Sequence, residues 1–89
     1  MGFEWDAAKA RINKAKHGVD FELAPEFDFA NAVIVIDDSE IYGEERLVAT
    51  GIIDLSVYVM VYVEHDETIR VISLRRATKK EIANYVESL

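Results

Sequence analysis

The most regular pattern of apolar and polar positions lies in the second half of the chain, at residues 57–63. This segment, VYVMVYV, has valine at every odd position and Tyr58, Met60 and Tyr62 at the even positions. Successive side chains of a strand point to opposite faces, and valine and tyrosine favour the pleated surface of a sheet. The segment therefore predicts a central strand, either covered on both faces or covered on one face and lining a site with the other.

Three further apolar segments predict the neighbouring strands of this sheet. They are residues 32–36, 47–53 and 69–75. The connections are polar and lie at residues 37–43, 54–56 and 64–67. Short connections join strands that run in opposite directions, so we expect an antiparallel meander of three or four strands. An earlier segment, residues 3–5, predicts either a short strand or an apolar anchor.

Residues 7–17 predict a helix with a clear signal at each end. Asp6 can accept hydrogen bonds from the free backbone N–H groups of the first turn, and Gly18 can adopt the left-handed conformation that ends a helix. One face of this helix is apolar, and we expect it to be buried; it comprises Ala8, Ile12 and Ala15. A polar face lies directly beside it and comprises Lys9, Asn13 and Lys16.

Two more helices are predicted, one on either side of the strands. Residues 21–29 predict a short helix, in which Pro25 either falls in the first turn or produces a kink. Residues 78–89 predict a C-terminal helix, because Thr78 and Glu81 have the spacing of a capping box. Its apolar residues recur at intervals of three and four and are expected to face the sheet; they are Ile82, Tyr85, Val86 and Leu89.

These elements predict the α+β class: a compact two-layer domain with N-terminal helices, an antiparallel sheet of three to four main strands and a C-terminal helix. The 89 residues make a single domain, residues 1–89. The chain has no cysteine and only two distant histidines, so we expect neither a metal nor a cofactor. The N-terminus lacks the pattern of a signal peptide, and the longest apolar run is too short to cross a membrane, so we expect a cytoplasmic protein.

Charge is distributed unevenly along the chain, and this distribution is more informative than the net charge. The net charge is −7, but residues 7–17 hold four cations and no acid, and residues 69–80 hold five cations and no acid. Residues 18–68 hold thirteen acids and one base, Arg46. An acidic protein repels nucleic acid at long range, whereas local cations can still bind phosphate. The two basic segments are therefore either solvated faces or the halves of an anion-binding site, with RNA phosphate as the candidate ligand.

Three groups of residues carry a resemblance to a known family. The first group is Phe3, Glu4, Trp5, Asp6, Lys9, Asn13, Lys16, His17, Gly18, Val19 and Phe21. The second is Glu45, Arg46 and Gly51, and the third is Ile69, Arg70, Ile72, Ser73, Arg75, Ala77, Thr78, Glu81 and Tyr85. In this order and spacing they resemble the BrnT family, ribonuclease toxins of bacterial type II toxin–antitoxin pairs. The chain departs from the family at Leu74, where a small alanine is usual.

The resemblance implies a RelE-like fold and metal-independent cleavage of RNA, neutralised by an antitoxin of the BrnA type. It also implies that operator DNA is bound only indirectly, through the antitoxin, and it implies no membrane partner. A second hypothesis is a catalytically inactive, toxin-like binding module that acts with an antitoxin in transcriptional autoregulation.

RNA can be cleaved without a metal when the ribose 2′-OH attacks the neighbouring phosphate. A base removes the 2′-OH proton, an acid protonates the leaving 5′-oxygen, and cations stabilise the extra charge on the phosphate. For catalysis we single out His17, Arg70, Arg75 and Glu45. For binding of RNA phosphate we single out Lys9, Asn13, Lys16, Arg46 and Arg76.

Each of these residues also has a purely structural interpretation. His17 before Gly18 can simply end the helix, the arginines can pair with acids of the body, and Asn13 can merely pack. On a strict period of two, Arg70 and Arg75 point to opposite faces of their strand, so they reach one site only if a bulge intervenes or the strand ends before Arg75. Four aromatic side chains can either stack on bases or belong to the core; they are Trp5, Tyr58, Tyr62 and Tyr85.

Overall fold

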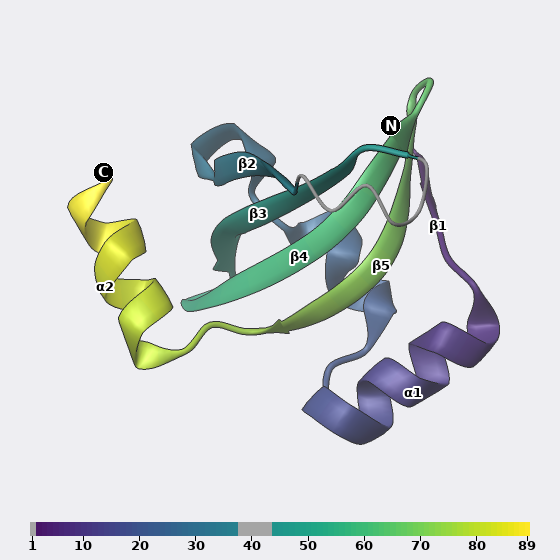
Figure 1. Ribbon diagram of the computed structural model, residues 1–89. Helices are drawn as coiled ribbons and strands as arrows, with labels where there is room; N and C mark the ends of the chain where they lie inside the picture. Colours follow the sequence, from purple (N-terminus) through teal and green to yellow (C-terminus); the bar gives the residue numbers. More distant parts are fainter. Residues whose placement is uncertain (1, 38–43) are drawn as a thin grey trace.

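The computed structural model describes residues 2–37 and 44–89 of the chain. Within these ranges it contains five strands, two α-helices and two short 3-10 helices (Figure 1). The strands are β1 (Gly2–Glu4), β2 (Val33–Asp37), β3 (Arg46–Ile53), β4 (Ser56–His65) and β5 (Thr68–Arg76). The helices are α1 (Ala7–His17), η1 (Phe21–Glu26), η2 (Phe29–Asn31) and α2 (Lys79–Glu87). No helix in the described ranges is long and apolar enough to span a membrane.

The five strands form one mixed sheet in the order β1-β5-β4-β3-β2. The meander from β2 to β5 is antiparallel, whereas β1 pairs in parallel with β5 and places Phe3 opposite Ile69. The prediction of an antiparallel sheet of three to four strands is therefore wrong. A three-residue strand is too short to show an alternating pattern, and its parallel partner lies far along the chain, so no local signal marks this pair.

The predicted group of N-terminal helices is also wrong, because only α1 is an α-helix. Residues 21–31 form the two 3-10 helices η1 and η2 instead of one longer helix. Leu23 N donates a hydrogen bond to Asp20 O, which is the three-residue spacing of a 3-10 turn. Pro25 has no N–H with which to continue an α-helical ladder, and Phe27 adopts extended backbone angles (φ −69°, ψ 129°) that end η1.

The hydrophobic core lies between the sheet and the 3-10 segment, which Figure 1 shows behind β4 and β5. β4 is central in the sheet, as predicted, and its core side chains are Tyr58, Met60 and Tyr62. β5 and the 3-10 segment supply other buried side chains, among them Val71, Leu74, Phe21 and Ala24. Gly51 of β3 belongs to the same contact, because a Cβ atom there would lie 2.8 Å from the Phe27 ring.

α1 has the predicted bounds and the predicted caps. Asp6 Oδ1 accepts hydrogen bonds from Ala8 N at 2.8 Å and from Lys9 N at 3.1 Å. These backbone hydrogen bonds favour the charged carboxylate and lower the pKa of Asp6. Gly18 has a φ of 70°, the left-handed conformation expected of a residue that ends a helix.

The predicted buried stripe of α1 is wrong. Ala8 and Ala15 are exposed and Ile12 is 66% exposed, whereas Asn13 of the polar stripe is only 6% exposed. The reason is the position of the helix, which lies at the β1–β5 side of the sheet and not over an apolar face (Figure 1). At such an edge, a polar side chain can bond to main-chain groups that have no strand partner.

α2 begins with the predicted capping box, but only part of its apolar stripe faces the sheet. Glu81 N donates to Thr78 Oγ1, and Thr78 N donates to a carboxylate oxygen of Glu81. Tyr85 is 4% exposed, and its hydroxyl donates to Asn31 O. The other members of the stripe are exposed; they are Ile82, Val86 and Leu89. The expectation that the whole stripe would be buried is wrong, because the helix covers only one corner of the sheet, over β2 and β3.

Candidate functional site

A β-bulge interrupts the regular pairing of β4 with β5. Val61 pairs with Ser73, but the next residue, Tyr62, pairs with Val71. Ile72 is therefore an extra residue in β5, and the alternation of its side chains shifts by one at this point. Residues on the two sides of the bulge that would otherwise point to opposite faces now point to the same face.

The bulge places the two arginines of the predicted site on one face of the sheet. Arg70 pairs with Val63 and Arg75 pairs with Val59, and these valines share a face of β4. Ser73, which pairs with Val61, lies between them on the same face. A bulge therefore does lie between Arg70 and Arg75, which is the first of the two conditions under which both arginines could reach one site.

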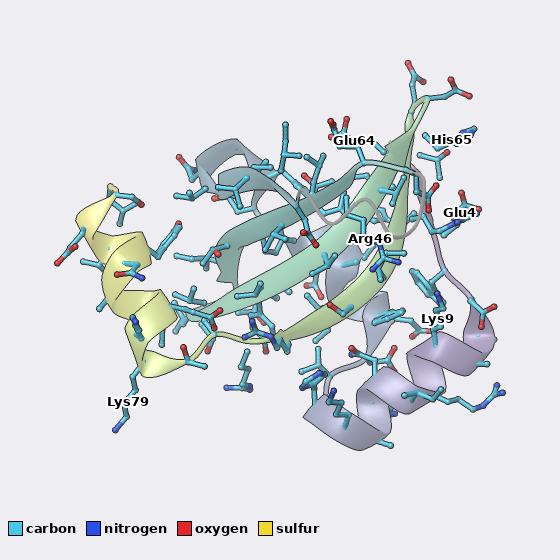
Figure 2. The ribbon with its side chains drawn as sticks, in the orientation of Figure 1. Glu4, Lys9, Arg46, Glu64, His65 and Lys79 are labelled. Carbon is cyan, nitrogen blue, oxygen red and sulfur yellow. The ribbon has the colours of Figure 1, made fainter. Side chains whose placement is uncertain are left out.

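Arg46 lies on the same face, two strands away. Leu47 pairs with Tyr62, so the antiparallel register brings Arg46 beside Val63, the residue opposite Arg70. Neighbouring strands are about 4.8 Å apart, so the backbones of Arg46 and Arg70 are separated by about 10 Å. Figure 2 shows Arg46 in the half of the molecule that also holds α1. We define the arginine face by four residues: Arg46, Arg70, Ser73 and Arg75.

Arg75 is held in place by a carboxylate. Its Nη1 donates to Glu81 Oε1 at 2.7 Å and its Nη2 donates to Glu81 Oε2 at 2.9 Å. The arginine hydrogen bonds lower the pKa of Glu81 from its ordinary 4.5 to about 2, and the same bonds raise the pKa of Arg75. The pair fixes the position of the guanidinium. A guanidinium has five N–H groups, so Arg75 keeps donors for a further anion.

Arg70 is held much more loosely. Its Nη1 lies 3.8 Å from an oxygen of Glu44, and both side chains are about half exposed. Exposed pairs at this distance contribute little to stability and exchange readily with other ligands. Glu45 is exposed and directly precedes Arg46, at the start of β3.

Asn13 fixes α1 to the edge of β5. Its Nδ2 donates to Leu74 O at 2.8 Å and to Val19 O at 3.1 Å, and its Oδ1 accepts from Leu74 N at 3.2 Å. β1 pairs only with residues 68–70 of β5, so the side chain of Asn13 takes the place of a neighbouring strand at Leu74. Both N–H groups of the amide are used, which favours the packing role over the phosphate-binding role for Asn13.

The other residues singled out on α1 surround this contact. His17 is half-buried and lies one turn beyond Asn13, about 6 Å along the helix axis. Lys9 and Lys16 are exposed. Since Asn13 bonds to Leu74, the residue before Arg75, α1 is joined to β5 next to one residue of the predicted site.

Arg76 lies apart from the arginine face. It pairs with Tyr58, whose side chain belongs to the core side of the sheet, and its guanidinium lies 5.6 Å from the centre of the Tyr58 ring. This is a cation–π contact. Figure 2 shows Lys79 at the opposite end of the molecule from Lys9 and Arg46. The basic segment at residues 69–80 is therefore divided among several surfaces.

The four aromatic side chains considered for base stacking pack within the protein instead. Three are buried, Tyr58 at 6%, Tyr62 at 1% and Tyr85 at 4% exposure. Trp5 is half-buried, with its ring edge-on to Phe21 at 6.0 Å between ring centres. Burial raises the pKa of the Tyr62 hydroxyl. Of the two interpretations left open by the sequence, the core interpretation fits all four.

Sequence reasoning missed the second role of Glu81. Its spacing from Thr78 predicts a helix cap, and the same carboxylate also binds Arg75. A signal was available, because a helix cap fixes Glu81 in the first turn and the connection from Arg75 to Thr78 is very short. Ser73 was likewise overlooked as a member of the arginine face.

Comparison with known proteins identifies the family to which this architecture belongs. A family described as "Ribonuclease toxin, BrnT, of type II toxin-antitoxin system" matches residues 5–81. The chain belongs to the BrnT family. The match runs from Trp5 to Glu81 and so includes the first helix and the whole arginine face.

A solved structure of a family member agrees with this assignment. The chain is similar to the Brucella abortus ribonuclease toxin BrnT, known from a crystal structure, with a TM-score of 0.72 and 29% sequence identity. The similarity covers 89% of this chain and 99% of the Brucella chain. No curated protein matches the chain significantly. The resemblance drawn from the three residue groups is thus confirmed, and a ribonuclease toxin of this class implies an RNA substrate and an antitoxin partner.

Proposed function

We propose that the protein is a metal-independent endoribonuclease that cleaves RNA by attack of the 2′-OH on the adjacent phosphate. In this proposal an antitoxin of the BrnA type neutralises it in the cytoplasm, and operator DNA is bound only through that antitoxin. The observation that supports the proposal is the arginine face of a BrnT-family protein: the bulge at Ile72 puts Arg70 and Arg75 on one side of the sheet, and the register of β3 with β4 adds Arg46.

The arginines have different roles in binding the phosphate. Arg75 is fixed by Glu81, so it is oriented before RNA arrives and loses little freedom on binding. Arg70 exchanges its weak contact with Glu44 for phosphate oxygens. Arg46, about 10 Å from Arg70 across the sheet, binds the same phosphate or the adjacent one. Lys9 and Lys16 bind flanking phosphates from the exposed side of α1.

The proton transfers fall to His17 and Glu45. Histidine is the side chain that most readily gains and loses a proton near neutral pH, and His17 lies one turn beyond Asn13, which binds β5 at the residue before Arg75. One group takes the 2′-OH proton as the 2′-oxygen bonds to phosphorus, and the other donates a proton to the departing 5′-oxygen. The products are a 2′,3′-cyclic phosphate and a 5′-OH end, and no further reactant is needed.

The proposal is tested with antitoxin-free protein and RNA in EDTA. We expect the wild type to cleave the RNA and to leave cyclic phosphate ends. Arg70→Ala and His17→Ala should each lower the rate by about 100-fold, as expected for loss of one charge-stabilising or proton-transfer group. Lys14→Ala is the control, because Lys14 is an exposed cation outside the arginine face and pairs with Asp20 at 3.6 Å. Intact RNA after incubation with well-folded wild-type protein would contradict the proposal.

The net charge of −7 favours one alternative function. A catalytically inactive toxin-like module that acts with an antitoxin in transcriptional autoregulation has no need to attract RNA. This alternative predicts that antitoxin binding persists while the wild type and all variants leave RNA intact.

A further inference from the structure

Exposed apolar side chains gather on two neighbouring elements. Among the described residues, nine large apolar side chains are exposed, of which four lie on β2, two on α2 and one, Leu89, just after α2. The exposed fractions reach 57% at Ile36 of β2 and 57% at Val86 of α2. We call these seven residues the apolar band: Val33, Ile34, Val35, Ile36, Ile82, Val86 and Leu89. Single exposed apolar residues are ordinary, whereas a row of four along one strand marks an interaction surface. Val33 and Val35 lie on the face of β2 next to α2, and Ile34 and Ile36 point to the opposite face, so an occupant along the edge of β2 would meet all four.

β2 is an edge strand of the sheet. It is the last strand of the sheet order, and within the described residues no strand pairs with its outer side. Natural edge strands are usually blocked by lysine, proline or a bulge. The sequence of β2, VIVID, has none of these, and its register with β3 is regular. Its outer N–H and C=O groups therefore offer a template for another extended chain.

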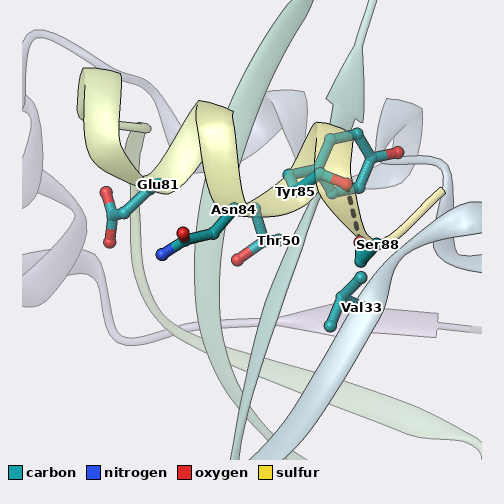
Figure 3. Close-up of a pocket in the computed structure, with 6 residues that line it drawn as sticks. All are labelled: Val33, Thr50, Glu81, Asn84, Tyr85 and Ser88. Carbon is teal, nitrogen blue, oxygen red and sulfur yellow. Dashed lines mark hydrogen bonds between the residues drawn. The ribbon is translucent and has the colours of Figure 1, made fainter.

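A cavity lies between β2 and α2, beside the apolar band. It has a volume of about 150 Å³ and is lined by Val33, Thr50, Glu81, Asn84, Tyr85 and Ser88 (Figure 3). A cavity of this size accepts a group about as large as benzene. Val33 and Tyr85 supply apolar surface to the lining, and the other lining residues are polar. It is suited to one apolar side chain of a partner.

Charge identifies the kind of partner that fits. A second copy of the chain would bring a net charge of −7 against −7, which opposes self-association. Glu87 is exposed beside Val86 on α2. A segment with apolar side chains alternating with lysine or arginine would match the apolar band, the charge of Glu87 and the net negative charge of the protein.

We infer that the apolar band binds the antitoxin, through an extended segment whose apolar side chains alternate with basic ones. The segment adds to the sheet as a strand along β2 and inserts one apolar side chain into the cavity. The inference rests on the toxin–antitoxin pairing in the proposed function and does not depend on catalysis. The cavity residue Glu81 also holds Arg75, so the bound segment lies next to the arginine face.

The test uses the full-length antitoxin encoded with this toxin and measures its affinity for toxin variants. Val35→Lys and Val86→Lys should weaken binding by about tenfold or more, as expected for residues inside an interface. Ile12→Lys and Leu55→Lys are matched controls, because Ile12 is 66% and Leu55 100% exposed outside the band. The controls should bind like the wild type. Hydrogen exchange of the outer β2 amides should slow in the complex.

The outcomes separate this inference from the ribonuclease proposal. Equal affinity of all four variants would overturn the apolar band as the docking surface, and RNA cleavage measured in parallel would be unaffected by that result. A free toxin that is dimeric in solution and dissociates on Val35→Lys would also overturn it, because the occupant would then be a second copy. Failure of the wild type to bind the antitoxin would overturn both the pairing and the docking surface. Selective loss with the band variants supports the inference, whether or not RNA is cleaved.

Discussion

Glu81 connects two parts of the molecule with one carboxylate. One oxygen accepts a hydrogen bond from Thr78 N at the start of α2, and both oxygens accept hydrogen bonds from Arg75 at the end of β5. The carboxylate partly neutralises Arg75, which weakens its attraction for phosphate. The carboxylate also fixes the long side chain of Arg75, so the N–H groups that do not bond to Glu81 are already oriented. Arg70, with its weak contact to Glu44, represents the opposite arrangement.

The Arg75–Glu81 pair predicts a particular dependence of stability on pH. The folded-state pKa of Glu81 is about 2, below the ordinary 4.5. Its stabilising contribution is therefore complete above pH 4.5 and is lost as the pH falls from 4.5 towards 2. We expect a loss of about 1–2 kcal/mol in the free energy of unfolding over this range, less than the pKa shift alone implies, because the side chain is partly exposed to screening solvent.

The measurement is urea unfolding between pH 2 and pH 7 for the wild type and for Glu81→Gln. The variant should be less stable at pH 7 and should lose less stability on acidification. Glu87→Gln is the control, since Glu87 is an exposed acid of the same helix. Parallel pH curves for the wild type and Glu81→Gln would show that the pair contributes nothing to stability.

Among the secondary-structure elements, the contact between α1 and β5 depends on one buried amide. Asn13→Ala removes three hydrogen bonds and leaves the backbone of Leu74 without this partner. We expect a loss of about 2–3 kcal/mol in the free energy of unfolding, measured by urea denaturation. Asn84→Ala on the exposed side of α2 should change it by less than about 0.5 kcal/mol. Unchanged stability with weakened RNA binding would instead assign Asn13 to the phosphate site.

The same contact explains which elements could be predicted from the sequence. The ends of α1 and the capping box of α2 depend on residues a few positions apart, so local patterns predict them well. The buried face of α1 depends on what lies next to it, and an edge strand selects Asn13 where a sheet face would have selected Ile12. Pairing of β1 with β5 joins distant segments and leaves no local pattern.

The bulge, in contrast, left a trace in the sequence. The buried residues of β5 are Ile69, Val71 and Leu74, spaced by two and then by three. A strict strand has a spacing of two throughout, so the interval of three marks an inserted residue. The same inserted residue shifts the polar positions of β5 by one, so Arg70 and Arg75 lie on one face. Arg46 could not be added in this way, because its place depends on the register of β3 with β4.

For the whole molecule, the main conflict is between an acidic body and a cationic site. The net charge of −7 repels RNA at distances beyond the site itself, whereas the arginine face attracts phosphate at contact. At 0.1 M salt, charges more than about 10 Å apart are largely screened. Salt therefore reduces the long-range repulsion between the acidic protein and RNA more than it reduces the direct contacts between arginine and phosphate. The apolar band contains none of the arginines, so the proposed antitoxin contact and phosphate binding use different, adjacent residues.

This balance predicts how RNA binding responds to salt. Each phosphate contact to single-stranded RNA adds about −0.7 to the slope of log affinity against log salt concentration, so two or three contacts give a slope of about −1.5 to −2. Arg70→Ala should make the slope shallower by about 0.7, since one phosphate contact is lost. Lys14→Ala should leave it unchanged, because Lys14 lies outside the arginine face and pairs with Asp20. Fluorescence titration of a short labelled RNA between 50 mM and 300 mM salt would provide about the range needed to measure these slopes. A slope that Arg70→Ala does not alter would place RNA binding elsewhere, since Arg70 holds Glu44 loosely, at 3.8 Å, and is expected to exchange it for phosphate.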